Sequence, residues 1–437
     1  MDTNTRKAYI DKVVDLDKRS AKPLHKATVI LRRVFKELFS GDKALRKDLK
    51  NFLQKNLFKK NVKHKKNYEF DNLFKEKQKL ISEYIDKNRA DNKSMPCVIF
   101  FGYPDFRTSG GGQRSWQMAK SFFRTGYHVE YYHEGTLQKD DVNWPAQIAF
   151  PLYYTDIDTI FRNIPEDATI IFEAPSYKYA DILRKAHEKR IYTIYEHIDN
   201  WETSLGSGFF EPELFKEFLN TCNCIVATCK GLVDLIAKYT DRHVLYSPNA
   251  VDNHLYKKEV DYDRPSDLVC GRKTLLYFGA LTGEWHNWEI VRKTALECPD
   301  CTFNLIGRGI PEAFKSEKPH NIHLLGPKKQ TELPAYLANC DFALLPFDTG
   351  EISRYVSPLK IFEYLALQVP VLATPLDDII GYPNTVISND YKEWVKTINS
   401  DFKATDTTAF TENNCWDARC RQLIEYKEKY FSESKKE

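Results

Sequence analysis

Long apolar runs are missing from this chain of 437 residues. No stretch approaches 18 consecutive apolar residues, and the polar amino-terminal end lacks the apolar segment of a signal peptide. We therefore expect neither secretion nor a membrane span, and we expect the protein to be cytoplasmic. The hydrophobic share of 42%, with 14% aromatic residues, is typical of a soluble globular protein with two or three domains.

A complete zinc-site pattern is missing among the ten cysteines. Cys298 and Cys301 form a single C-x-x-C pair, without a second pair or nearby histidines to supply the other ligands. We interpret the ten as reduced, mostly buried thiols.

Acidic residues are scarce in residues 1–66, which hold 20 Lys plus Arg and 7 Asp plus Glu, a balance of 20 − 7 = +13. Since the whole chain carries +3, the remainder carries 3 − 13 = −10. The helical patterns in this leader predict helices whose apolar faces must pack against another surface. That surface is the catalytic body, a partner enzyme or an anionic membrane face. Stacking aromatics of the kind that bind nucleic acid are missing, so we expect no nucleic-acid partner. A solvated extension is the plain alternative.

From residue 97 onward, apolar runs typical of buried strands alternate with helical patterns. The first run, residues 97–103, leads into a glycine loop, a helix and a second strand, which together make one βαβ unit. Further strands are expected at residues 168–175, 190–199 and 222–229, and a second series begins at residue 274. Two such series predict an α/β protein with two doubly wound, Rossmann-like domains facing a cleft.

These patterns and the polar stretches between them divide the chain into five parts. We predict a basic helical extension over residues 1–94, a first Rossmann-like domain over 95–250, a connector over 251–272, a second Rossmann-like domain over 273–410, and a terminal helix over 411–437.

The segment of residues 356–374, VSPLKIFEYLALQVPVLAT, has the pattern of a loop, a helix and a buried strand. Ser357 is a good N-cap and Pro358 suits the first helical position. A helix N-terminus attracts phosphate, Lys360 adds a positive charge, and Glu363 lies within reach of hydroxyls on the same ligand. The layout fits a diphosphate followed by a ribose. The alternative is a surface helix on which Lys360 and Glu363 form a solvent-exposed pair.

This segment resembles the nucleotide-sugar motif of GT-B glycosyltransferases, particularly the retaining family 4 group, in which S-P-x-K-x-x-E-Y precedes a P-V-[IVL]-A-T strand. The resemblance extends over residues 96–431 and includes LYSPNAVDNHLY, residues 245–256, which is similar to the P-N-G-V-D crossing between the two halves of such proteins. It implies that the terminal helix crosses back to the first domain. The donor-binding residues that we predict are Gly111, Gly112, Arg308, Ser357, Pro358, Leu359, Lys360 and Glu363.

His197 and Asp199 end the expected strand at residues 190–199, and in doubly wound sheets function collects at the carboxyl ends of strands. The segment YEHIDNW resembles the strand end where these enzymes place a histidine or an aspartate beside the donor sugar. We therefore predict catalytic roles for His197 first and Asp199 second. A histidine hydrogen-bonded locally in a loop is the alternative.

Two features depart from the family. The second glutamate that many members carry, eight positions before Glu363, is Tyr355 here, and the Arg/Lys pair after the second domain's first strand is absent. Lys360 and Arg308 remain as the phosphate charges. The D-x-D spacings at residues 156–158 and 261–263 do not end strands, so we expect neither a metal ion nor another cofactor.

The resemblance implies a glycosyltransferase that moves a hexosyl or deoxyhexosyl group from a nucleoside-diphosphate sugar to a saccharide or lipid-linked saccharide, with retention, in cell-surface polysaccharide or glycoconjugate synthesis. We expect a cytoplasmic protein that is peripheral on the inner face of the membrane. The alternatives are a nucleotide-sugar epimerase or phosphorylase, and an inactive GT-B module that binds a glycan or scaffolds a partner enzyme.

Overall fold

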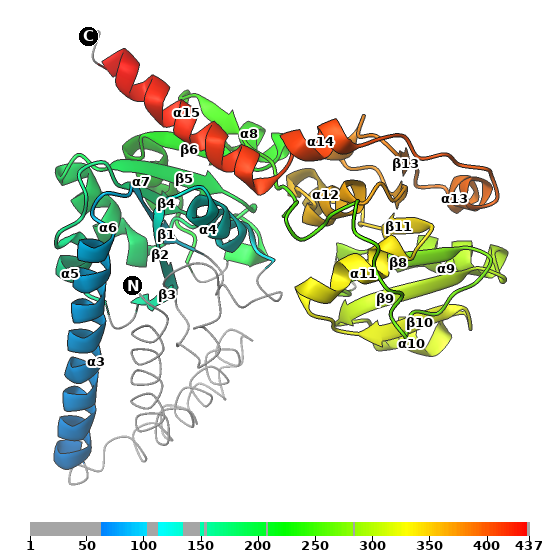
Figure 1. Ribbon diagram of the computed structural model, residues 1–437, viewed down its shortest axis with the longest axis horizontal. Coiled ribbons are helices and arrows are strands. Elements are labelled where there is room, and N and C mark those ends of the chain that lie inside the picture. Colours follow the sequence, from blue (N-terminus) through cyan, green and yellow to red (C-terminus); the bar gives the residue numbers. More distant parts are fainter. Residues whose placement is uncertain are drawn as a thin grey trace, which may run out of the picture. The chain divides into compact units, whose positions relative to one another are not determined.

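The computed structural model describes residues 63–102, 112–133, 149–152, 155–206, 209–282 and 285–434 (Figure 1). The chain divides into a smaller unit of residues 1–96 and 130–166 and a larger unit of residues 97–129 and 167–437. No helix among the described residues is long and apolar enough to cross a membrane. The leader helices expected before residue 63 lie outside the described residues.

Helix α3 (Lys63–Asp91) of the smaller unit has a buried face although it is rich in lysine. Ile81 and Tyr84 lie on that face and are at most 6% exposed. Arg89 lies there too, and its Nε and Nη2 donate to the two carboxylate oxygens of Glu130 at 2.7 and 2.8 Å. Removing one member of such a buried pair typically costs about 3–5 kcal/mol, so the pair fixes this end of the helix within its unit.

Strand β2 (His128–His133) leads into the smaller unit and pairs in parallel with β3 (Ala149–Pro151). Helix α5 (Ile157–Phe161) follows, and the Asp156 carboxylate accepts a hydrogen bond from the Thr159 N–H at 2.7 Å. Asp156 therefore acts as the N-cap of a helix.

The larger unit holds a first parallel sheet whose strands lie side by side in the order β1-β4-β5-β6-β7. Their bounds are β1 Cys97–Phe101, β4 Thr169–Phe172, β5 Tyr192–His197, β6 Cys224–Ala227 and β7 Val244–Tyr246. The connecting helices are α4 Arg114–Arg124, α6 Tyr177–Glu188, α7 Pro212–Thr221 and α8 Lys230–Ile236. Every residue of β1, β4, β5 and β6 is buried, as in a sheet covered on both faces.

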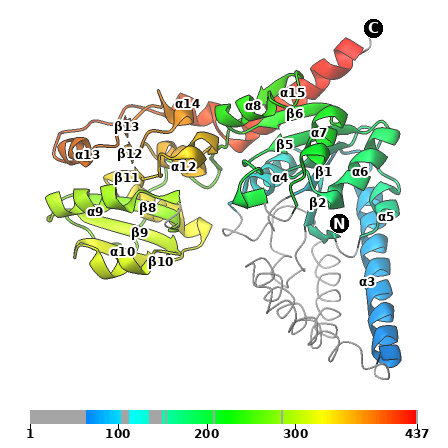
Figure 2. The same cartoon turned by 180° about the vertical axis from the view of Figure 1, so that it is seen from behind.

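A second parallel sheet of the same unit has six strands in the order β10-β9-β8-β11-β12-β13 (Figure 2). Its strands are β8 Thr274–Ala280, β9 Thr302–Arg308, β10 Ile322–Gly326, β11 Phe342–Leu345, β12 Val371–Ala373 and β13 Thr385–Ile387. Its helices are α9 Trp288–Glu297, α10 Glu312–Glu317, α11 Leu333–Ala338, α12 Leu359–Ala366, α13 Tyr391–Ile398 and α14 Thr408–Asn413. The chain runs outward through β9 and β10, then returns to β11 beside β8, so the strand order reverses between β8 and β11. Ligands bind at such a reversal, on the carboxyl side of the strands.

We call residues 97–129, 167–250 and 416–434 the first half, and residues 251–415 the second half. The chain passes between them twice, and the two passages pair: the Val251 N–H donates to the Asn414 carbonyl at 3.0 Å, and the Trp416 N–H donates to the Val251 carbonyl at 3.1 Å. Helix α15 (Trp416–Ser434) then runs back along the first sheet.

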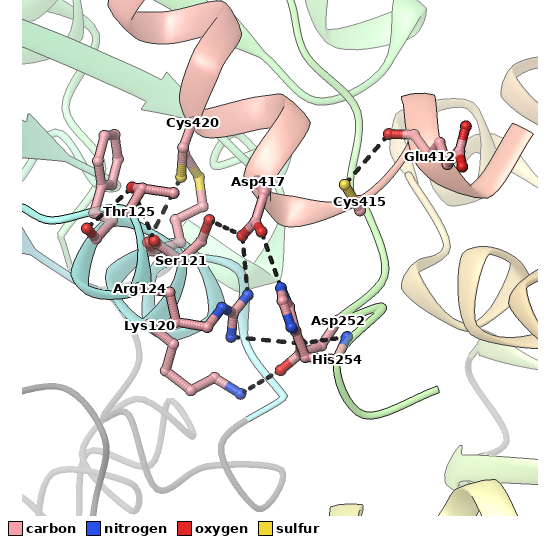
Figure 3. Close-up of polar contacts among 12 residues, drawn as sticks. Lys120, Ser121, Arg124, Thr125, Asp252, His254, Glu412, Cys415, Asp417 and Cys420 are labelled. Atoms are coloured by element: carbon pink, nitrogen blue, oxygen red, sulfur yellow. Dashed lines mark hydrogen bonds and ion pairs between the residues drawn. The ribbon is translucent and has the colours of Figure 1, made fainter. Parts of the chain in front are cut away.

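Polar side chains join α15, α4 and the start of the second half (Figure 3). The Asp417 carboxylate accepts from Arg124 at 3.0 Å and from the Ser121 hydroxyl, and it lies 3.0 Å from His254 Nε2. Asp252 pairs with Lys120 at 3.1 Å. These contacts connect both passages of the chain to the same helix of the first half.

The ten cysteines are free thiols, of which eight are buried. Burial raises the pKa of Cys222 and Cys229 to about 12. Both side chains therefore pack as neutral thiols at physiological pH.

The structure confirms the predicted architecture of two doubly wound, parallel, Rossmann-like sheets.

Candidate functional site

A cavity of about 810 Å³ lies between the two halves of the larger unit. From the second half it is lined by the carboxyl ends of β8 and β9 and by the start of α12, and from the first half by residues that follow β1 and β5. The reversal of strand order thus faces this cavity. Eight of the ten predicted site residues line it: Gly112, Asp199, Arg308, Ser357, Pro358, Leu359, Lys360 and Glu363. Gly111 lies outside the described residues.

Helix α12 begins one residue later than expected, at Leu359, with Pro358 as its N-cap residue. The prediction that Ser357 caps the helix is wrong, because its hydroxyl accepts a hydrogen bond from the Asn249 N–H at 3.0 Å. No side chain caps α12 in the structure. The free amides of its first turn lie at the cavity and can bind an anion.

Lys360 runs from α12 across the end of β8. Its Nζ lies 5.6 Å from the centre of the Tyr277 ring, within the range of a cation–π contact. Burial lowers the pKa of Lys360, while the nearby Glu363 acts in the opposite direction. A diphosphate would offset the cost of burying this ammonium group, because opposite charges favour each other most where water is excluded.

Gly279, near the end of β8, makes room for Lys360. A Cβ at this position would lie 2.1 Å from Lys360 Cε, and the backbone φ of +139° is one that other residues rarely adopt. Gly307, one residue before the end of β9, is constrained in the same way, since a Cβ there would lie 1.7 Å from the Gly279 carbonyl oxygen. Neither glycine was predicted as a site residue, although a glycine inside a strand pattern signals close backbone approach.

Glu363 is 4% exposed. Burial raises the pKa of Glu363 to about 7, and the positive charge of Lys360 and the nearby Tyr256 hydroxyl partly oppose this shift. The carboxyl group therefore changes charge in the neutral pH range. As a carboxylate it can accept two hydrogen bonds from a vicinal diol such as that of a ribose.

Arg308, the last residue of β9, is exposed and lines the cavity. Among the described residues, Arg308 has no ion-pair partner. Its guanidinium remains free to bind an anion.

His197 does not lie among the described residues that line the cavity, so the structure contradicts the expectation that it faces a bound sugar. It is 1% exposed, and its ring stacks on Phe215 of α7 with ring centroids 4.9 Å apart. Its Nδ1 lies 2.8 Å from the Tyr195 hydroxyl. Burial lowers the pKa of His197 to about 3, so the ring is neutral and packs as part of an aromatic cluster.

Asp199, two residues further on, does line the cavity and is half-buried. Burial raises the pKa of Asp199 to about 7. A carboxyl group that titrates near neutral pH is suited to proton exchange or to stabilising positive charge. The geometry thus favours Asp199 over His197 for chemistry in this cavity.

Further polar residues of the first half line the cavity and were not predicted, among them Arg114 and Asn249. Arg114 is 4% exposed and pairs with Glu196, with Nη2 2.9 Å from Oε1. Asn249 lies in the SPNAVD segment that the sequence marks as a crossing. Arg114 had no local pattern to identify it, and the crossing motif did not give Asn249 a role at the site, because both roles depend on partners far away in the sequence.

Comparisons with known proteins agree with this geometry. Residues 272–400 match the model of the family described as glycosyl transferases group 1. Over 97 residues the chain is 30% identical to TuaH of Bacillus subtilis, which is named a glycosyltransferase of teichuronic acid biosynthesis. That match spans 21% of this chain and 24% of TuaH.

Solved structures share the fold over most of the chain. Sucrose-phosphate synthase from Thermosynechococcus elongatus is 12% identical, with a TM-score of 0.57, and the likeness covers 77% of this chain and 99% of that one. HepE from Anabaena, solved in complex with UDP-glucose, is 14% identical with a TM-score of 0.56, covering 77% and 100%. A glycosyltransferase from Rickettsia africae is 12% identical with a TM-score of 0.55, covering 77% and 99%. The fold is therefore the predicted GT-B arrangement of two Rossmann-like sheets.

Proposed function

We propose that the protein is a retaining, family 4 type glycosyltransferase that moves a hexosyl or deoxyhexosyl group from a nucleoside-diphosphate sugar to a saccharide or lipid-linked saccharide. The observation that carries this proposal is the start of α12, where free amides, Lys360 and Glu363 open onto one cavity. Amides and an ammonium group suit a diphosphate, and a carboxylate suits a ribose. The match of residues 272–400 to group 1 glycosyl transferases includes this helix and supports the proposal.

The residues of the second half would stabilise the leaving group. As the bond between sugar and phosphate breaks, negative charge develops on the diphosphate, and the positive end of α12, Lys360 and Arg308 favour that charge. The acceptor hydroxyl attacks from the same face and gives its proton to the departing phosphate oxygen. We propose that Asp199 stabilises the positive charge at the anomeric carbon from the first half, and that no metal ion is required.

Calorimetric titration with UDP and GDP tests the donor site. We expect binding of at least one of them, and we expect Lys360→Ala to weaken it by roughly 1.5–3 kcal/mol, the usual worth of a charge-assisted hydrogen bond. Full activity in EDTA is expected as well. Wild-type affinity in a folded Lys360→Ala variant would overturn the assignment of this site.

Tyr355 favours one second candidate, an inactive GT-B module that binds a glycan or scaffolds a partner. Incubation of donor with and without acceptor separates the alternatives. A transferase consumes the donor only when an acceptor is present, apart from slow hydrolysis. An epimerase converts the donor without an acceptor, and a phosphorylase requires phosphate. An inactive module leaves the donor unchanged.

We further propose a role in cell-surface polysaccharide or glycoconjugate synthesis at the inner face of the membrane. Support comes from the name of TuaH and from the +13 balance of residues 1–66, which suits an anionic surface or a partner enzyme.

A further inference from the structure

The loop of residues 350–358, which we call the donor loop, leads into α12 and is held by the first half. At its carboxyl end, the Asn249 N–H donates to the Ser357 hydroxyl at 3.0 Å, and Asn249 Nδ2 donates to the Ser357 carbonyl at 2.8 Å. Asn249 thus donates to both hydrogen-bond acceptors of Ser357, the hydroxyl and the carbonyl oxygen. Since α12 begins two residues later, this contact fixes where the first amides of the helix point.

Asn249 is itself held in place by two buried arginines. Arg114 Nη1 and Arg419 Nε donate to the Pro248 carbonyl at 3.0 and 2.8 Å, and Arg419 Nη2 donates to the Asn249 carbonyl at 3.4 Å. Arg114 and Arg419 are 4% and 8% exposed. Both belong to the first half, on α4 and α15, so the position of Asn249 is set by that half.

A second contact holds the middle of the donor loop. Gly231, in the first turn of α8, lies so close to the loop that a Cβ would stand 2.1 Å from the Arg354 carbonyl oxygen. The Arg354 side chain pairs with Asp234 of the same helix at 3.1 Å. Beside it, the Asp378 carboxylate accepts from the Lys230 N–H at 3.0 Å. The first half therefore contacts the donor loop at two separate points, Ser357 and Arg354.

We infer that Asn249 is a positioning residue for the donor site, through which the first half orients the amides of α12 toward the diphosphate. The inference rests on the proposed function. Part of the nucleotide affinity then depends on Asn249, which lies outside the half that carries Lys360, Glu363 and Arg308. The effect is assigned to the diphosphate rather than to the base, because the first turn of α12 faces the phosphate groups.

The test compares the affinities of UDP (or GDP, if that binds tighter) and of the matching nucleoside for the full chain and its variants. Asn249→Ala is expected to weaken diphosphate binding between about five- and tenfold, the range of one net hydrogen bond, and to leave nucleoside binding unchanged. Asn339→Ala is the matched control: Asn339 also donates to two backbone carbonyls, of Tyr262 and Ala335, but does not line the cavity. It is expected to bind both ligands as the wild type does.

Ser357→Ala removes the other bond of the pair, the one from the Asn249 N–H to the Ser357 hydroxyl, and leaves the Asn249 side chain in place. If Asn249 acts by positioning the loop, Ser357→Ala also weakens diphosphate binding, and the double variant, which keeps neither bond, binds diphosphate more weakly than either single variant. Wild-type affinity in Asn249→Ala, or an equal loss of nucleoside binding in that variant, would overturn the inference. Absence of diphosphate binding by the wild type would instead contradict the proposed function.

Gly231→Ala provides an independent variant at the other contact. It must displace the Arg354 carbonyl, so diphosphate binding is expected to weaken in the same direction. Alanine favours a helix over glycine, so a fall in the melting temperature of this variant would report the clash with the Arg354 carbonyl rather than a loss of helix propensity. Wild-type diphosphate affinity in this variant would show that the donor loop does not depend on its contact with α8.

Discussion

Glu363 is buried and Lys360 is half-buried at one site, where each charge is costly alone and favourable beside the other. Burial raises the pKa of Glu363 to about 7 and lowers that of Lys360. Because the pKa of Glu363 in the folded protein exceeds the ordinary 4.5, the folded state holds a proton that the unfolded state releases between about pH 4.5 and 7. The contribution of Glu363 to stability is therefore greatest below that window and is lost as the pH rises through it.

Nucleotide binding should show the opposite trend. Ribose hydroxyls donate hydrogen bonds to the carboxylate form, so affinity for UDP or GDP is expected to rise between about pH 6 and 8. Calorimetric titration across this range measures the trend, and Glu363→Gln serves as the control that has no such charge change. A rise of equal size in both proteins would assign the pH dependence to another group.

Asp199 and His197 are expected to separate in their effects. Asp199→Asn should lower kcat on the order of a hundredfold with little change in diphosphate affinity, since it removes charge at the reacting carbon. His197→Ala should instead lower the melting temperature, because it empties a packed position against Phe215. Steady-state kinetics and thermal melts of both variants measure kcat and the melting temperature. A stable His197→Ala variant that loses more kcat than Asp199→Asn would reverse the assignment.

These residues also mark what local sequence can and cannot predict. Lys360 and Glu363, which the sequence suggested as neighbours on one face of a helix, both line the cavity because helix spacing brings them together. Ser357 was assigned wrongly as a cap because its partner, Asn249, lies 108 positions away. His197 and Asp199 end the same strand pattern, and only the packing of α7 decides which one is enclosed.

The contact between β8 and Lys360 of α12 depends on Gly279, the residue before the last of the strand. Gly279→Ala should displace Lys360 and weaken diphosphate binding about tenfold, and it should cost about 1–3 kcal/mol of stability because of the backbone conformation. Gly326→Ala is the matched control, since Gly326 also has a positive φ, +70°, but a Cβ there meets nothing within 4 Å. Chemical denaturation and calorimetry of the two variants separate strain from contact. Equal loss of binding in both would mean that Lys360 is not displaced.

The order of strands and helices followed from apolar periodicity, since alternating buried runs and amphipathic helices leave few topologies for a parallel sheet. The unexpected features lie where elements meet. Gly231 is unremarkable within α8, and only the donor loop against it explains why a side chain would not fit.

At the scale of the whole molecule, the chain is polarised in charge between its leader and the rest. Deleting residues 1–62 leaves α3 intact and is expected to preserve turnover of soluble substrates while abolishing binding to vesicles that contain anionic lipid. Binding by the full chain should weaken as salt rises, because the attraction is screened. Vesicle co-sedimentation at several ionic strengths measures this. Equal sedimentation of both forms would reduce the leader to a solvated extension.

The paired passages at Val251 and Cys415 make the second half an insertion within the first. During synthesis, residues 251–415 leave the ribosome as one uninterrupted segment, whereas the first half still lacks α15. Cys420 and Leu423, at most 2% exposed in the finished protein, arrive only after that segment, so their binding surface beside α4 stays open until then. A chain that terminates early, even just before Trp416, would therefore hold a complete second half beside an unfinished and aggregation-prone first half.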